Sequence, residues 1–308
     1  MNDKKIFITG GAGFLGKNII KRYYDTNEIT IYSRDESKHY FLKKQYPRIR
    51  CIVGDIRNYD LLKRSSTGQD IGIFAASMKQ ISAVDENYEE GVEVIIKGGI
   101  NSRRVAEENK MESACFISSD KSRAATTLYG AMKYVAGESF IVNSERSNTR
   151  LSSAIYGNVM NSTGSIVPLI LDSLKNDREL VLYSERMTRF LIEIDEAIDL
   201  IEEGLKINGF NLIPNLRSFS VKDLFEIYHE EFDLKYSIGT PRVSEKLHEM
   251  MISKEETNRT FFDKEKNIYF MHYTNIYDKG VKEFTSDNVL LSKGELHKYL
   301  IDKNFYIQ

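Results

Sequence analysis

The chain contains no tryptophan, and only two cysteines and four prolines are found among its 308 residues. Cys51 and Cys115 lie in apolar, strand-like runs, so we expect buried, reduced thiols and no disulfide framework. No Cys/His cluster has metal-ligand spacing, and we predict no metal site. No apolar run approaches the roughly 18 residues that a membrane-spanning helix needs. With 43 basic and 45 acidic residues the net charge is −2, so nucleic acid is not an expected partner. The chain enters a strand-like run at Ile6–Ile8, which leaves no room for a signal peptide, and we expect a cytoplasmic protein.

What the chain does contain is a regular alternation of short apolar runs with amphipathic helical stretches, up to about residue 155. This alternation predicts an α/β fold, a doubly wound parallel sheet of Rossmann type with ligands at the carboxyl ends of the strands. The expected strands are Ile6–Thr9, Glu28–Tyr32, Arg50–Val53, Ile71–Ala75, Ala114–Ile117 and Leu151–Ile155. The expected helices are Phe14–Tyr24, a polar one ending at Tyr46, Glu89–Asn109 and Leu128–Ser144.

Beyond residue 155 the alternation loosens, and helices at Ile166–Asn176, Asp195–Leu205 and Val221–Glu231 predict a smaller lobe over the strand ends. We expect residues 1–158 to form the dinucleotide-binding domain, with part of 180–215 returning to it. Residues 159–308 are expected to form mainly a substrate-binding lobe and a tail. The tail, from about residue 254, is polar and aromatic and carries no clear motif.

Three glycines, Gly10, Gly13 and Gly16, lie between the first strand and the first helix. In this context the spacing is typical of a dinucleotide site: the first glycine allows a tight turn, the second a close approach to the pyrophosphate, and the third close helix–strand packing. The helix that starts with Phe14 and Leu15 offers unpaired N–H groups to the phosphates.

The end of the second strand favours NADP over NAD, although NAD remains possible. Ser33 and Arg34 precede Asp35 there, and a hydroxyl and a guanidinium suit a 2′-phosphate better than a carboxylate does. The alternative for Arg34 is a solvated surface residue. Asp55 and Ile56, after the third strand, are expected beside the adenine, and the alternative for Asp55 is a helix cap.

Tyr129 and Lys133 form a YxxxK pair, and residues four apart share one face of a helix. We expect the Lys133 ammonium to lower the pKa of Tyr129, so that the tyrosine can take a proton from a sugar hydroxyl. Ser119, Asp120 and Lys121 follow the strand ending at Ile117, where catalytic groups gather, and offer an acid and a base on one loop. The alternative is a surface Asp–Lys pair in a turn.

With these motifs the chain resembles an extended short-chain dehydrogenase/reductase, and more narrowly the inverting UDP-N-acetylglucosamine 4,6-dehydratases of the polysaccharide-biosynthesis family. The segments that carry the resemblance span roughly residues 4 to 252 in the family's order. They are Phe74–Gln80, Ser119–Lys121, Leu128–Lys133, Tyr156–Val159, Gly164–Pro168, Met187–Phe190 and Glu245–Glu249.

The resemblance implies a mechanism in which Tyr129 removes the O4 proton while hydride passes from C4 to NADP. Lys121 then takes the C5 proton, Asp120 protonates the departing C6 hydroxyl, and the hydride returns to C6. It also places Ala75 and Ala76 at the cofactor. The positions that it assigns to the nucleotide sugar are Lys79, Asn158, Arg189, Arg242 and Glu245. Salt bridges between the lobes are the alternative for the charged members of this set, and His248 is expected to be structural.

The sequence departs from the family's pattern at four positions, Ile95, Ile155, Thr163 and Ser244, where relatives usually carry Asn, Arg, Arg and Gly. These departures keep two alternatives open. One is a UDP-sugar 4-epimerase, which needs Tyr129 and Lys133 but not Lys121, and the other is a dinucleotide-binding paralogue without turnover. The resemblance further implies a homo-oligomer, with Glu89–Asn109 and Leu128–Ser144 as candidate interface helices.

Overall fold

The first strand shows how the sequence creates two buried faces. In β1 (Lys5–Thr9) the side chains of Ile6 and Ile8 lie on one side of the sheet and Phe7 on the other, because successive side chains of a strand alternate. All three are fully buried, and Phe7 packs in a separate cluster from the two isoleucines. A strand that is apolar on both faces needs helices on both sides of its sheet.

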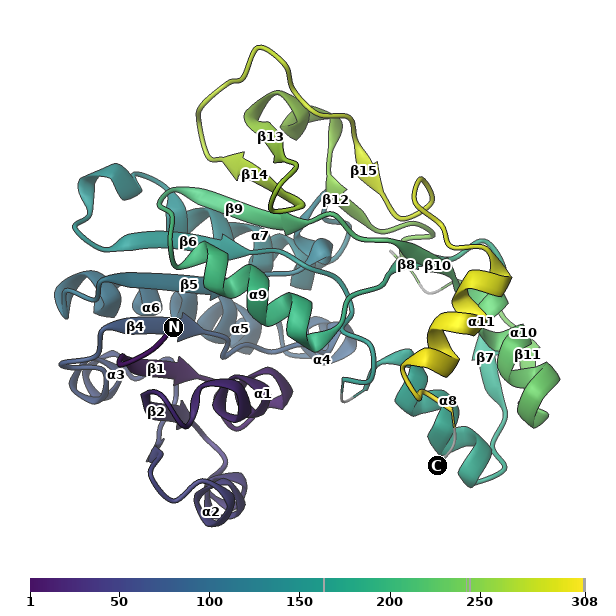
Figure 1. Cartoon of the computed structure of the whole chain (residues 1–308), viewed down its shortest axis with the longest axis horizontal. Coiled ribbons are helices and arrows are strands. Elements are labelled where there is room, and N and C mark those ends of the chain that lie inside the picture. The colour runs from purple at the N-terminus through teal and green to yellow at the C-terminus, as the bar shows by residue number, and fades with distance from the viewer. Residues whose placement is uncertain (163, 242, 244, 307–308) are drawn as a thin grey trace.

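The computed structural model describes residues 1–162, 164–241, 243 and 245–306, and it confirms the predicted α/β class (Figure 1). Nine strands form one sheet in the order β13-β14-β9-β6-β5-β4-β1-β2-β3. The seven from β9 to β3 are parallel. These seven are β1 and six further strands: β2 (Glu28–Ser33), β3 (Arg50–Val53), β4 (Ile71–Phe74), β5 (Ser113–Ile117), β6 (Arg150–Ala154) and β9 (Phe210–Pro214).

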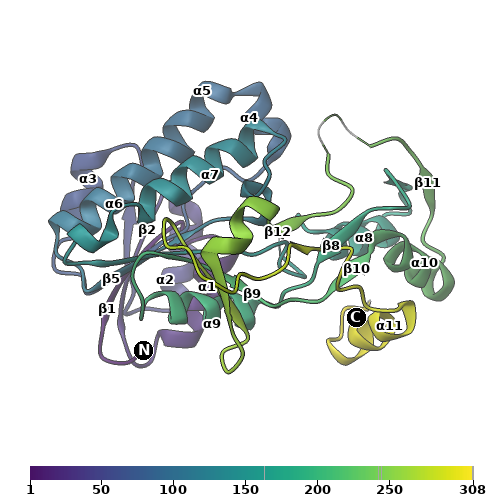
Figure 2. The ribbon, with the colours of Figure 1, turned by 90° about the horizontal axis from the view of Figure 1, so that it is seen from above.

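Helices cover both faces of this sheet, as Figure 2 shows from above. One face carries α1 (Phe14–Tyr23), α2 (Glu36–Gln45) and α9 (Ile194–Gly204). The opposite face carries α3 (Tyr59–Ser65), α4 (Ile81–Glu86), α5 (Tyr88–Gly91), α6 (Gly98–Glu108) and α7 (Leu128–Ile141). Of these, α3 and α4 were not predicted from the sequence.

The predicted helix Glu89–Asn109 is not uniform, because a π-helical segment, Val92–Lys97, joins α5 to α6. A π segment inserts an extra residue into the helical turn and often marks a functional region. Here the neighbouring residues Val94 and Ile95 are both buried, and Gly98 packs against Ile56, where a Cβ would lie only 2.8 Å from the isoleucine side chain. Ile95, one of the departures from the family's pattern, is therefore a core residue.

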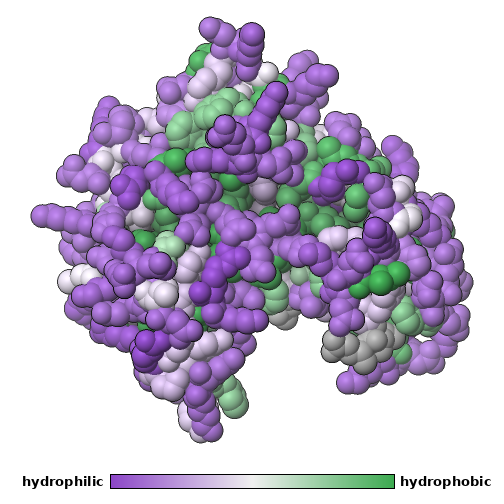
Figure 3. All heavy atoms as spheres, in the orientation of Figure 1, coloured by the Kyte–Doolittle hydropathy of each residue, from purple (hydrophilic) through white to green (hydrophobic). Residues whose placement is uncertain are grey.

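A smaller lobe lies beside the sheet and has its own apolar core, which includes Phe219, Leu224, Tyr228, Leu296 and Leu300. Figure 3 shows the outline of the molecule notched between the main body and this lobe. Its helices are α8 (Ile166–Lys175), α10 (Val221–Phe232) and α11 (Lys293–Asp302). Its strands pair as β8 (Thr188–Phe190) with β10 (Ser218–Ser220), and β7 (Leu180–Leu182) with β11 (Tyr236–Ile238). A third pair, β12 (Met250–Ile252) with β15 (Phe284–Thr285), packs instead in the same apolar cluster as Ile6 and Ile8 of the main sheet.

The tail, to which the sequence analysis assigned no structure, extends the main sheet. β14 (Ile268–His272) pairs antiparallel with β9, and β13 (Thr260–Asp263) pairs antiparallel with β14. Stacked rings of Phe261 and Phe270, 5.3 Å apart, stabilise this edge. No helix in the described part of the chain is long and apolar enough to cross a membrane.

Candidate active site

The glycine turn after β1 brings the ends of three strands together. Gly10 has φ of +69°, which favours glycine, and its N–H donates to Tyr32 O at the end of β2 (2.8 Å). A Cβ on Gly10 would lie 3.0 Å from the backbone nitrogen of Ala76, which follows β4. The residues predicted to surround a dinucleotide, Gly10, Ala75 and Ala76, are therefore adjacent in the structure.

The N-terminus of α1 has the form of a phosphate cradle. Gly13 occupies its N-cap position with no side-chain cap, so the N–H groups of Phe14, Leu15 and Gly16 have no partner within the helix. A Cβ on Gly16 would lie 2.3 Å from the Gly11 carbonyl oxygen, so only glycine lets the helix approach the turn this closely. These features fit the pyrophosphate of a dinucleotide.

At the end of β2 the residues predicted to select NADP differ in the contacts that they make. Asp35 caps α2, accepting from Lys38 N (3.0 Å) and pairing with Lys38 Nζ (2.8 Å). Ser33 Oγ lies 2.6 Å from His39 Nε2. Arg34 is exposed and makes no hydrogen bond or ion pair with any residue that the structure describes. Because the Asp35 carboxylate caps α2 and pairs with Lys38, Arg34 is the exposed charged residue at this strand end.

The loop after β3 is held by its own contacts. The Asp55 carboxylate pairs with Arg57 (2.7 Å), which lowers the Asp55 pKa, and Asn101 donates to Ile56 O (3.1 Å). Asp55 is therefore neither a helix cap nor unpaired, and Asn58 caps α3 instead. Ile56 is buried beside it.

At the end of β5 the predicted acid and base form an ion pair in which Asp120 is buried and Lys121 is partly exposed. Asp120 is 1% exposed and begins a 3₁₀ turn, Asp120–Ser122. Its Oδ1 accepts from Ser119 Oγ (2.9 Å) and from Lys121 Nζ (3.1 Å). Burial raises the Asp120 pKa, which favours the protonated form. Lys121 Nζ also donates to Asn158 Oδ1 (3.2 Å), so these two predicted site residues are in contact.

The YxxxK pair starts α7, with Thr127 as its N-cap, and both side chains are buried. Lys133 Nζ donates to Ile117 O (2.7 Å), and burial lowers its pKa to about 8. The expected lowering of the Tyr129 pKa by Lys133 is wrong for this structure. Burial raises the Tyr129 pKa, and the charge that opposes this rise is that of Lys121.

The remaining predicted substrate residues are only partly brought together. Arg189, on β8, pairs with Glu245 (3.3 Å) and donates to the carbonyls of Thr188 and Leu247, so the salt-bridge alternative is realised here. Lys79 lies exposed in the loop between β4 and α4, and Arg242 falls outside the described residues. His248 Nδ1 bonds Thr188 Oγ1 (2.9 Å), which agrees with a structural role.

Glu249 belongs to this group, although sequence reasoning gave it no role. It is 3% exposed, and its Oε1 lies 3.4 Å from Lys121 Nζ and 3.7 Å from Arg189 Nε. Its only signal in the sequence is its place at the end of the Glu245–Glu249 motif. Sequence alone does not separate it from the other glutamates.

A second unpredicted feature is a buried ion network behind the loop that carries Asp120 and Lys121. Arg123, fully buried, pairs with Glu138 of α7 (3.2 Å) and with Glu256 of the tail (2.7 Å). Arg259 pairs with the same two carboxylates. The tail thereby holds the active-site loop against α7.

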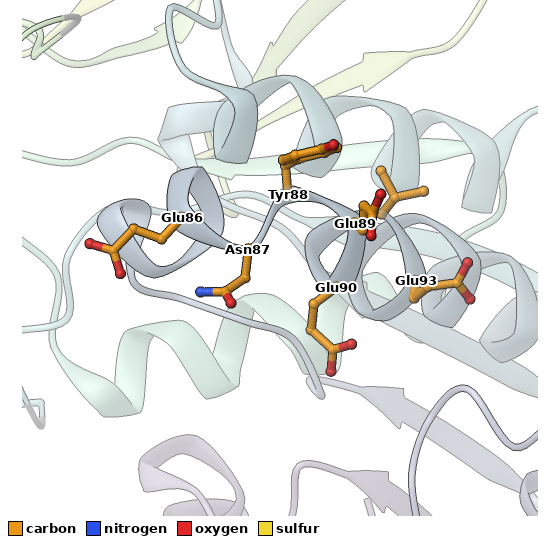
Figure 4. A pocket seen from close by; sticks show the side chains of 7 residues that line it. Glu86, Asn87, Tyr88, Glu89, Glu90 and Glu93 are labelled. Atoms are coloured by element: carbon orange, nitrogen blue, oxygen red, sulfur yellow. The ribbon is translucent and has the colours of Figure 1, made fainter.

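Figure 4 shows a different hollow, of about 740 Å³, along α4, α5 and the π segment. Its charged lining side chains are all acidic: Glu86, Glu89, Glu90 and Glu93. Such a lining repels a pyrophosphate, so this hollow does not fit a nucleotide. Within the described residues there is also no cluster of three or more metal-ligating side chains.

Known proteins resemble this chain both in sequence and in structure. Residues 6–271 match the model of a family described as polysaccharide biosynthesis protein. The chain is 32% identical over 271 residues to UDP-N-acetylglucosamine 4,6-dehydratase (inverting) of Campylobacter jejuni, covering 84% of this chain and 80% of that protein. It is 30% identical to UDP-glucose 4-epimerase of Rickettsia massiliae, covering 82% and 79%. The X-ray structure of Pen from Bacillus thuringiensis superposes with a TM-score of 0.91 at 27% identity, covering 99% of both chains.

Proposed function

Because the chain belongs to the polysaccharide biosynthesis protein family, we propose that it is a nucleotide-sugar 4,6-dehydratase that uses NADP. The proposed substrate is UDP-N-acetylglucosamine, converted to a 4-keto-6-deoxy sugar with inversion at C5. The observation that carries the proposal is the pair of buried Asp120 and partly exposed Lys121 at the end of β5, near Tyr129. Elimination of water needs an acid and a base in addition to the group that oxidises C4.

NADP would lie along the ends of β1, β2 and β4, with its pyrophosphate at the N-terminus of α1 and its 2′-phosphate near Arg34. When bound, it would supply the hydride acceptor for C4 and the hydride donor for C6. The protein's own residues move the protons. Tyr129 takes the O4 proton, the neutral amine of Lys121 takes the C5 proton, and Asp120 gives its proton to the leaving C6 hydroxyl. C5 is reprotonated from the opposite face when the hydride is returned to C6. The burial that keeps the proton on Asp120 supports the acid role.

The second candidate is a UDP-sugar 4-epimerase, favoured by the similarity to the Rickettsia protein of that name. Epimerisation requires transfer of the C4 hydride and a proton acceptor at O4, which Tyr129 supplies. It leaves Asp120 and Lys121 without a chemical task, and burying the Asp120 carboxyl group costs free energy that a task would explain.

The test is to incubate the purified protein with UDP-N-acetylglucosamine and to identify the product by mass spectrometry and NMR. Loss of water supports the dehydratase, and unchanged mass with a new sugar supports the epimerase. No conversion contradicts both for this substrate and favours a different nucleotide sugar or a paralogue without turnover.

Two variants assign the roles. Lys121→Ala is expected to abolish water loss and solvent-deuterium incorporation at C5 while cofactor binding persists, because a positioned base contributes about 10²–10⁴-fold. Asp120→Asn is expected to slow elimination yet allow some C5 exchange. Lys206→Ala, at an exposed lysine two residues beyond the end of α9, serves as the control. Near wild-type turnover of Lys121→Ala would contradict the dehydratase mechanism.

The proposal includes a cytoplasmic location, cofactor binding by residues 1–158, substrate binding mainly by 159–308, and self-association. The helices expected at the interface expose apolar side chains, with Ile100 on α6 and Leu128, Tyr134 and Val135 on α7 each at least 40% exposed. A second copy packed on this face would bury them. A monomer mass in light scattering at micromolar concentration would contradict self-association.

A further inference from the structure

Glu249 is a buried carboxylate to which the proposed mechanism assigns no role. Its Oε1 contacts Lys121 Nζ (3.4 Å) and Arg189 Nε (3.7 Å), a proposed base and a proposed substrate ligand. Its Oε2 is buried and has no hydrogen-bond partner among the described residues. A buried carboxylate costs free energy unless it is paired, and this one is paired only with groups of the candidate site.

The backbone fixes Glu249 from both sides. Its N–H donates to Ser286 Oγ (2.9 Å), and the Ser286 N–H donates to its carbonyl oxygen (2.9 Å). Ser286 Oγ is in turn 2.6 Å from Thr188 Oγ1, next to Arg189 on β8. Glu249 is therefore anchored to two separate elements, and its side chain is directed to Lys121 by a rigid frame.

Asp120 and Glu249 share one ammonium group, because Lys121 Nζ lies 3.1 Å from Asp120 Oδ1 and 3.4 Å from Glu249 Oε1. Two carboxylates this close repel each other when both are ionised, so a proton is retained on one of them. Among the described residues Glu249 forms ion pairs with two cations, Lys121 and Arg189, whereas Asp120 forms one with Lys121. The arrangement favours the charge on Glu249 and the proton on Asp120.

We propose that Glu249 is a positioning residue of the acid–base group, which fixes Lys121 and Arg189 and keeps Asp120 in its acid form. The inference rests on the proposed dehydration, in which Asp120 must donate a proton. Glu249 itself exchanges no proton with the sugar and acts through its charge on its neighbours.

The electrostatics agree with this assignment. The Asp120 pKa is raised by burial and further by the Glu249 charge. Burial works against ionised Glu249, yet the charges of Lys121 and Arg189 hold its pKa below the usual value. Burial likewise opposes charged Lys121, but Asp120 and Glu249 raise its pKa. The other cation whose charge reaches both carboxyls is Lys246, whose ammonium binds Arg123 O.

The first test needs no substrate. In Glu249→Gln the Lys121 amine loses the partner that carries the negative charge, and removing an opposite charge at this distance lowers a pKa by about 1–3. The pH midpoint for modification of Lys121 by an amine reagent, measured by peptide mass spectrometry, is therefore expected to fall by at least about 1. In the matched control, Glu245→Gln, which pairs with Arg189 but has no contact with Lys121 among the described ion pairs, the midpoint is expected to stay in place. An unchanged midpoint in Glu249→Gln overturns the inference.

The second test uses turnover. Loss of the Glu249 charge lowers the pKa of both Asp120 and Lys121, so both inflections of the kcat–pH profile are expected to move to lower pH. Glu249→Asp, which restores the charge, is expected to move them back. A slower Glu249→Gln enzyme with unmoved inflections would show a structural role only and overturn the inference. If the wild-type protein does not dehydrate UDP-N-acetylglucosamine, the proposed function fails, while the labelling test still decides the charge coupling.

Discussion

The ion network behind the active-site loop gives a sharp prediction for stability. It contains two cations, Arg123 and Arg259, and two carboxylates, Glu138 and Glu256, so its charges balance. Glu256→Gln keeps the acceptor oxygen that binds Ser253 N, yet removes one charge. Arg123, whose side chain is 0% exposed, then keeps only Glu138 as a charged partner.

Removing one partner of a buried ion pair typically costs about 3–5 kcal/mol, because the remaining charge is buried without compensation. Since Glu138 remains, we expect Glu256→Gln to lower the free energy of unfolding by about 3 kcal/mol. Adding Arg123→Met restores charge balance between Arg259 and Glu138. The double variant is therefore expected to be less destabilised than the sum of the single variants, by about 1–2 kcal/mol.

Urea unfolding followed by circular dichroism and tyrosine fluorescence measures these differences, since the chain has 18 tyrosines and no tryptophan. Burial opposes ionised Glu256, but the charges of Arg123 and Arg259 hold its pKa below the ordinary 4.5. Its contribution is present above about pH 4.5 and is lost as the pH falls through the lower, folded-state pKa. The gap between wild type and Glu256→Gln must therefore close in acid. A cost below about 0.5 kcal/mol, or strictly additive variants, would refute the reasoning.

Three further predictions concern the cofactor site. NADP is expected to bind at least about tenfold tighter than NAD, a difference of about 1.4 kcal/mol that calorimetry can measure. Arg34→Ala should remove this preference, and equal affinities of the wild type for the two cofactors would contradict the prediction. Gly16→Ala, whose Cβ would lie 2.3 Å from the Gly11 carbonyl oxygen, should weaken cofactor binding at least about tenfold, whereas Gly294→Ala, with open space around it, should leave binding unchanged. Because the Lys133 pKa is lowered to about 8, the charge of Lys133 is lost above that pH, and the rate of C4 oxidation should decline there. The absorbance of the reduced nicotinamide measures this rate. In Lys133→Arg the decline should move to higher pH, and a pH profile identical to that of the wild type would refute the assignment.

The sequence by itself determined the parallel core and the place of the site. Apolar residues run without interruption through Ile6–Ile8 of β1, and Gly10, Gly13 and Gly16 follow at the spacing of a phosphate-binding turn. Local pattern was therefore sufficient for the strand, the turn and the helix. The position of Asp120 and Lys121 after an apolar strand also predicted them as candidate site residues, because parallel strands end at one edge of a sheet.

Only the tertiary structure decided which charges meet. Lys121 and Glu249 are 128 positions apart in the sequence, and Arg123 and Glu256 are 133 apart. No sequence periodicity connects residues that are brought together by long-range packing. The same holds for β14, an apolar and aromatic segment of the tail, which joins the main sheet because the edge of β9 offers unpaired backbone groups. The direction of the Tyr129 pKa shift was missed because the i,i+4 spacing places Lys133 on the same helix face but does not fix its hydrogen-bond partner, which is Ile117 O. Local pattern specifies the elements and their polar ends, whereas burial and charge pairing depend on the assembled chain.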